Sequence, residues 1–104
     1  MLTIVSMTQA STSRARLLAA TDGAVTFAVA GEDIVVPGRA DDAAARRECG
    51  LARRVERVVF TSVSGSWTAS VIAVWGRLPQ TRSVSLPAAL ALAAAGHTTM
   101  VESR

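Results

Sequence analysis

The sequence contains no lysine, no asparagine and no tyrosine, and all eleven of its basic residues are arginine. The codons of the three missing residues are rich in A and T, so their absence indicates a GC-rich genome rather than a function. Abundant arginine and a formal net charge of +3 at pH 7 are therefore weak evidence for nucleic-acid binding.

Cysteine is nearly absent. Cys49 is the single cysteine, which excludes an intrachain disulfide and a multi-cysteine metal site. No apolar run reaches the roughly 18 residues of a membrane span. The N-terminal MLTIVSM lacks the basic region and long apolar core of a signal peptide. We therefore expect a cytoplasmic protein without a membrane span, whose true start is either Met1 or Met7.

Aromatic residues make up only 4% of a chain that is 50% hydrophobic. The core must therefore be built from valine, leucine and alanine, which bury little area per residue. Oligomerisation is a natural way for such a small chain to bury more. The length of 104 residues fits one domain, which we place at residues 14–104, after a flexible or edge-strand N-terminus at residues 1–13.

Residues 55–78, VERVVFTSVSGSWTASVIAVWGRL, predict a β-hairpin around which the rest of the chain is organised. Its turn centres on Ser64-Gly65 or on Gly65-Ser66, and both suit a two-residue connection. Side chains alternate between the two sides of a strand. One side then carries Val58, Phe60, Trp67, Val71 and Trp75, and the other carries Val59, Val63, Ile72 and Val74. Because both faces are largely apolar, we expect both to be covered, either within the chain or by a second copy on one side.

Strands are also predicted at residues 14–20, 24–30 and 34–36, with a type I′ turn at Asp22-Gly23. A helix opens at Asp41-Asp42 and either runs to residue 54 or ends at Gly50. Residues 79–82 read as a loop, Ser85 caps a second helix, and residues 100–101 can form a last short strand. The predicted fold is α+β, a mainly antiparallel sheet of five or six strands with two helices, in the order β-β-β-α-β-β-α with an optional closing β.

An arginine-rich helix face is the first candidate site. If the helix continues across Gly50, four arginines fall within an arc of about 120°, with a fifth nearby on the next strand. These residues are Arg46, Arg47, Arg53, Arg54 and Arg57. Such a face suits a phosphate backbone or an acidic partner, whereas a solvated helix face is the simpler interpretation. It lacks the interleaved aromatic residues that stack on bases.

Catalysis has no positive support in the sequence. His97 lacks a nucleophile elbow such as GxSxG, and Cys49 borders an apolar helix face, as expected for a small buried residue. We expect no metal site and no cofactor. The leading hypothesis is a small non-catalytic interaction or regulatory module that forms a homodimer through a face or an edge of the central hairpin. Its expected interface residues are Phe60, Trp67, Val71 and Trp75. The alternative is a nucleic-acid-binding regulator that uses the arginine-rich helix face.

Overall fold

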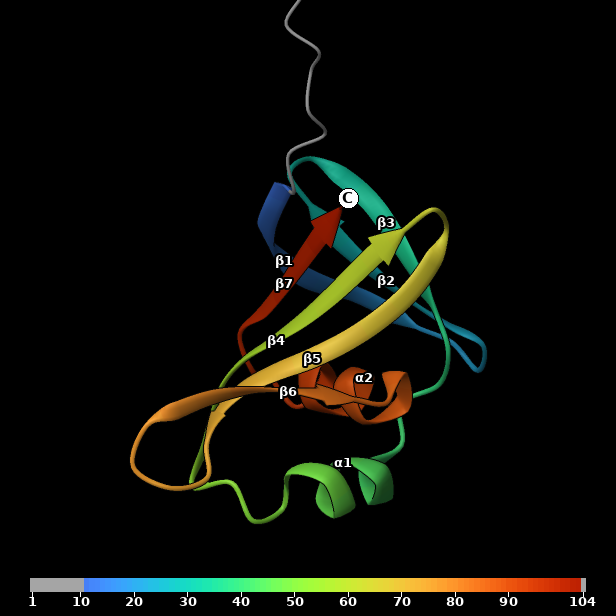
Figure 1. Cartoon of the computed structure of the whole chain (residues 1–104). Coiled ribbons are helices and arrows are strands. Elements are labelled where there is room, and N and C mark those ends of the chain that lie inside the picture. Colours follow the sequence, from blue (N-terminus) through green and yellow to red (C-terminus); the bar gives the residue numbers. More distant parts are fainter. Residues whose placement is uncertain (1–10, 104) are drawn as a thin grey trace, which may run out of the picture.

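A computed structural model of the chain describes residues 11–103 and contains one sheet and two helices (Figure 1). The elements follow the order β1 (Ser11–Ala20), β2 (Ala24–Val29), β3 (Glu32–Pro37), α1 (Asp42–Cys49), β4 (Arg54–Val63), β5 (Ser66–Val74), β6 (Pro79–Val84), α2 (Leu86–Ala94) and β7 (Thr99–Ser103). The predicted N-terminal segment lies mostly outside the described residues, but its last three residues belong to β1.

The sheet has seven strands in the order β3-β2-β1-β7-β4-β5-β6. Every neighbouring pair is antiparallel except β4 and β7, which run parallel. The α+β class is confirmed, whereas the strand count of five or six was too low. One missed strand is β6, which was predicted as a loop. It is an edge strand, and Pro79 is its first residue. Proline is tolerated at such a position because it lacks the N–H group that a central strand would need to donate to the ladder.

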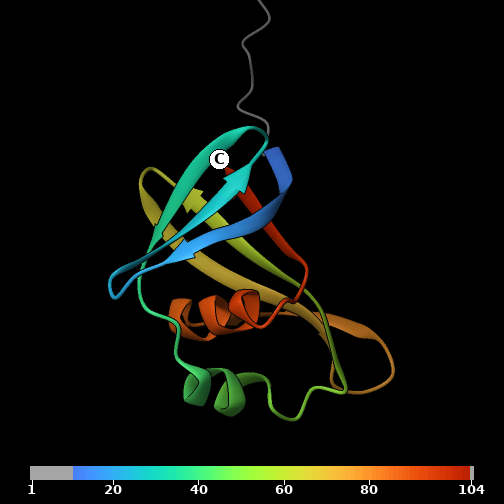
Figure 2. The ribbon, with the colours of Figure 1, turned by 180° about the vertical axis from the view of Figure 1, so that it is seen from behind.

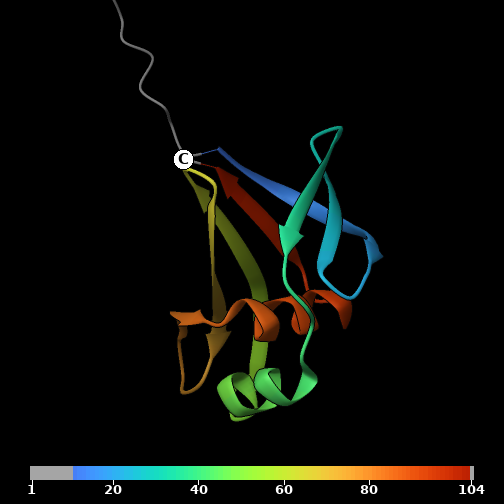
Figure 3. The ribbon, with the colours of Figure 1, turned by 90° about the vertical axis from the view of Figure 1, so that its right-hand side faces the viewer.

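The sheet curls on itself around a single core. Phe27 on β2 and Phe60 on β4 have ring centroids 5.4 Å apart, although β1 and β7 separate their strands in the sheet. Figure 2 shows β1, β2 and β3 crossing over the rest of the sheet, and Figure 3 shows α2 across the lower end of the curl with α1 below it. Leu90 of α2 is fully buried among the inward-facing side chains. The inner face of the sheet and α2 therefore form the core.

The central hairpin forms as predicted. Its turn centres on Ser64-Gly65, where both residues have positive φ, 51° and 82°, as a type I′ turn requires. Val63 pairs with Ser66, and the register is regular as far as a bulge between Val55 and Arg57. The buried side chains of the hairpin lie on the predicted face, except Val74, which is 8% exposed on the other face.

The first hairpin differs from the prediction. β1 and β2 are joined by residues 21–23, and Gly23 does not have the positive φ that a type I′ turn needs. A bulge between Leu17 and Ala19 shifts the register. Leu18 falls within this bulge and is exposed, whereas the preceding Leu17 packs against the core.

Both helices begin at the predicted caps. The Asp41 carboxylate accepts hydrogen bonds from the backbone N–H groups of Ala43 and Ala44, at 2.9 and 3.2 Å. The hydroxyl of Ser85 accepts one from the N–H of Ala88 at 3.3 Å. α1 ends at Cys49, with Gly50 as its C-cap. The shorter of the two predicted helices is therefore correct.

Glu48 joins the two helices. Its carboxylate accepts hydrogen bonds from the backbone N–H of Ser85 at 2.7 Å and from the Ser85 hydroxyl at 2.6 Å. Negative charge at the N-terminus of α2 also suits the helix dipole. Glu48 and Ser85 are 37 positions apart, so no local pattern in the sequence predicts this contact.

Candidate functional site

The edges of the central hairpin are paired along most of their length. β4 lies between β7 and β5, and β5 lies between β4 and β6. β7 pairs with residues 58–62 of β4, and β6 pairs with residues 69–74 of β5, so residues 54–57 and 66–68 have no partner strand on that side within the described part of the chain. An interaction through an edge of this hairpin, one of the two predicted modes, is therefore limited to these short segments.

The inner face of the hairpin is filled by the chain itself. Phe60 and Val71 are both 0% exposed, so their prediction as interface residues is wrong: the curl of the sheet makes them core. Trp67 and Trp75 are partly buried and pack against the same core. The guanidinium carbon of Arg82 also lies 4.0 Å from the ring centroid of Trp75, a cation–π contact. Phe60 and Val71 are therefore not available to a ligand between the two tryptophans.

The outer face of the hairpin is the surface that remains. Val59 pairs with Met100 on β7 and with Ser70 on β5. Ile72 lies two residues beyond Ser70 on β5 and therefore on the same side of the sheet. Val59, Ile72 and Met100 are partly exposed and lie on the side opposite the core. Neither α1 nor α2 crosses the outer side of β4 and β5 (Figure 3). We call Val59, Ile72 and Met100 the outer patch.

Charge is arranged along the strands on this outer face. Arg57, which is exposed, pairs with Ile72 at one end of the outer patch. Glu102 pairs with Thr61 at the other end, and the hydroxyl of Thr12 donates a hydrogen bond to it at 3.3 Å. The outer patch is therefore flanked by a basic end and an acidic end.

The five predicted phosphate-binding arginines do not form one helix face. Arg46 and Arg47 lie in the last turn of α1. Arg53 precedes β4, Arg54 is its first residue, and Arg57 lies on its outer face. The continuous stripe required the helix to cross Gly50, and the chain leaves α1 there instead.

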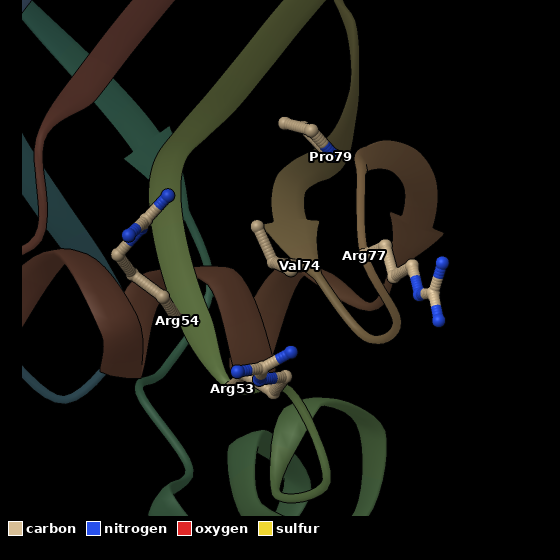
Figure 4. A pocket seen from close by; sticks show the side chains of 5 residues that line it. All are labelled: Arg53, Arg54, Val74, Arg77 and Pro79. Carbon is tan, nitrogen blue, oxygen red and sulfur yellow. The ribbon is translucent and has the colours of Figure 1, made fainter.

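Arg53 and Arg54 line a hollow together with Arg77, which the sequence analysis did not identify (Figure 4). Val74 and Pro79 provide its apolar surface, and its volume is about 360 Å³. Arg54 pairs with Val74 across β4 and β5, which brings together residues about 20 positions apart. Only this pairing reveals that Arg77 belongs with Arg53 and Arg54, so no local pattern could have identified it.

Cys49 is buried, as expected from its place on the apolar side of α1. Burial, followed by repulsion from Glu48, raises the pKa of its thiol, and attraction from Arg82 opposes this less strongly. A buried thiol with a raised pKa is a poor nucleophile. This environment fits a packing role for Cys49 rather than a reactive one.

Alkaline pH is expected to destabilise the fold through Cys49. The chain has no lysine or tyrosine, so this thiol is the one side chain expected to titrate between about pH 8 and 10. Its pKa is higher in the folded state, so its contribution to stability is complete below the unfolded value, about 8.5. That contribution is lost as pH rises toward the folded value. Urea unfolding at pH 7, 8, 9 and 10 should show this decline. A Cys49→Ala variant should lack it, and equal declines in both proteins would contradict the assignment.

Among residues 11–103, no group of three or more His, Cys, Asp or Glu side chains is placed to hold a metal ion. Within the same range, no helix is long and apolar enough to cross a lipid bilayer. Comparison of the chain with known protein families, with curated proteins and with solved structures found no match. The functional proposals below are therefore drawn from the geometry of the chain itself.

Proposed function

We propose that this protein is a small non-catalytic interaction module that self-associates through the outer face of its central hairpin. The supporting observation is the outer patch. The inner face of the hairpin is core and its edges are paired along most of their length, so the outer face is the side of the hairpin that a partner can reach along its middle. Partly exposed valine, isoleucine and methionine at the centre of a sheet lose water favourably when covered.

The charge pattern favours a second copy of the chain as the partner. In a two-fold symmetric contact the same surface meets itself. Packing two such faces with opposite strand directions brings the end with Glu102 in one copy over the end with Arg57 in the other. The outer patches then meet at the centre. This arrangement pairs unlike charges at both rims, whereas packing with the same strand direction would set arginine near arginine.

The area of the outer face sets the expected affinity of the dimer. Three strands spaced about 4.8 Å apart, each exposing about five residues of 3.3 Å, cover a footprint of only a few hundred Å². A standard stable interface buries about 800 Å² per partner. We therefore expect a reversible dimer with a Kd on the order of 10 µM, which is monomeric when dilute and mostly dimeric above about 100 µM.

A charge introduced into the outer patch should abolish the dimer. In Val59→Glu, a carboxylate at the centre of the contact would be buried opposite its symmetry mate, at a cost of several kcal/mol. Light scattering coupled to size-exclusion chromatography, from 5 to 200 µM, should show the wild-type mass rising with concentration and the variant remaining monomeric. Circular dichroism would verify that the variant is folded.

Val35→Glu is the matched control, because Val35 is 54% exposed on the edge strand β3, away from β4, β5 and β7. This control should dimerise like the wild type. A wild-type protein that stays monomeric at 200 µM would refute the proposal, as would a folded Val59→Glu variant that dimerises normally. Nucleic-acid binding through an arginine-rich helix is not proposed, because α1 carries only part of the stripe.

A further inference from the structure

We propose that the hollow between Arg53, Arg54 and Arg77 binds a small phosphorylated molecule. This hollow lies where β4 begins and β5 ends, beside the connection to β6. None of the lining residues belongs to the outer patch, although Val74 lies two residues beyond Ile72 on the same side of β5, and the inference does not depend on self-association. Three arginines from two segments line one hollow, although their side chains point in different directions (Figure 4), and a guanidinium presents several N–H donors in a planar fork.

Two of the arginines are fixed by the hairpin. The backbone N–H of Arg53 donates to the carbonyl of Val74 at 2.6 Å, and the Arg53 guanidinium donates to the carbonyl of Gly76 at 3.2 Å. These bonds hold Arg53 against the segment that carries Arg77. Arg54 begins the paired part of β4. A ligand would therefore meet a basic rim whose backbone is already ordered, which lowers the entropic cost of binding.

The charges near the hollow are unbalanced. Its lining contains three arginines and no carboxylate. The nearest compensating group is Glu56, whose carboxylate lies 2.9 Å from the Arg54 guanidinium. Within the described part of the chain, Arg77 makes no hydrogen bond or ion pair, and Arg53 uses one of its five side-chain N–H donors. An anion entering the hollow would find N–H donors of Arg53 and Arg77 that no side chain among the described residues occupies.

The shape of the hollow favours a phosphate with an organic group attached. Arginine forks match both phosphate and carboxylate oxygens, but three cations suit the double charge of a phosphate monoester better than a single carboxylate. Val74 and Pro79 offer an apolar surface for the rest of the molecule. The volume of about 360 Å³ is at the lower end of small-molecule sites. A nucleic-acid strand would instead need an extended basic track with stacking aromatics, and none of the residues that line the hollow is aromatic.

Titration of the wild-type chain with inorganic phosphate and with AMP, followed by ¹H–¹⁵N NMR at low ionic strength, tests this inference. We expect saturable shifts centred on residues 53, 54 and 76–78, with AMP binding several-fold more tightly than phosphate because of the apolar surface. Arg77→Gln should weaken AMP binding about tenfold, the effect of losing one charged hydrogen-bonding group. Arg77 is exposed and has no hydrogen bond or ion pair with residues 11–103, so this variant should fold normally.

Arg39→Gln is the matched control, because it removes the same charge from an exposed residue beside the start of α1. It should bind AMP like the wild type. Absence of localised shifts at 10 mM AMP would overturn the inference, and so would equal weakening by Arg39→Gln and Arg77→Gln. A single-stranded DNA oligomer that displaces AMP and binds more tightly per phosphate would also overturn it, in favour of a nucleic-acid site.

Discussion

A chain that stops after Thr98 is expected not to fold. This truncation removes β7, which pairs with β1 on one side and with β4 on the other. It would leave two unpaired strand edges in the middle of the sheet and remove the buried residues Thr99 and Val101. Burial of a single valine contributes about 1.5–3 kcal/mol, and the lost ladder on both sides adds to this. The total stability of a domain of this size is only about 5–15 kcal/mol.

Circular dichroism and a one-dimensional proton NMR spectrum would measure the result of this truncation. A chain ending at Glu102 is the matched control, because it keeps both buried residues of β7 and loses only the last two positions. We expect the control to unfold cooperatively and the shorter chain to show no cooperative transition. A cooperative transition in the shorter chain would mean that β7 is a peripheral strand.

Phe60→Ala is expected to lower the free energy of unfolding by about 3–5 kcal/mol. Phe60 is fully buried and its ring lies 5.4 Å from that of Phe27. Because aromatic residues are scarce in this chain, the substitution would remove one of its few large core side chains and leave a cavity. The surrounding alanines and valines are too short to fill the space. This large loss follows from the curl of the sheet, which places both rings in one core.

Urea denaturation with the wild type as reference would measure this change. Leu51→Ala is the matched control. This substitution also removes a large apolar side chain, but Leu51 is 91% exposed. Its expected effect is within about 0.5 kcal/mol. A loss below about 1.5 kcal/mol for Phe60→Ala would show that the inner face of the hairpin is not the core.

Local patterns in the sequence were sufficient to predict the central hairpin. Alternation fixes which side chains share a face whatever the exact turn, so Phe60 and Val71 were placed together correctly. The caps at Asp41 and Ser85 could also be predicted, because each side chain acts on backbone groups two or three residues away.

Long-range pairing accounts for what the sequence did not reveal. Two residues at the C-terminus suggested only a short last strand, and nothing local indicates that it inserts between β1 and β4. The curl that brings Phe27 to Phe60 is equally non-local, so core residues were mistaken for an interface. Arg77 joins Arg53 and Arg54 only through the register of β4 and β5.

If a second copy of the chain covers the outer patch, the methyl groups of Ile72 and Met100 lose solvent exposure as the protein concentration rises. NMR with a soluble paramagnetic probe measures this exposure directly. We expect strong signal loss for both methyl groups at 5 µM and protection of both at 300 µM, while the Val35 methyl signals are weakened equally at both concentrations. Equal signal loss for Ile72 and Met100 at the two concentrations would show that no second copy covers the outer patch.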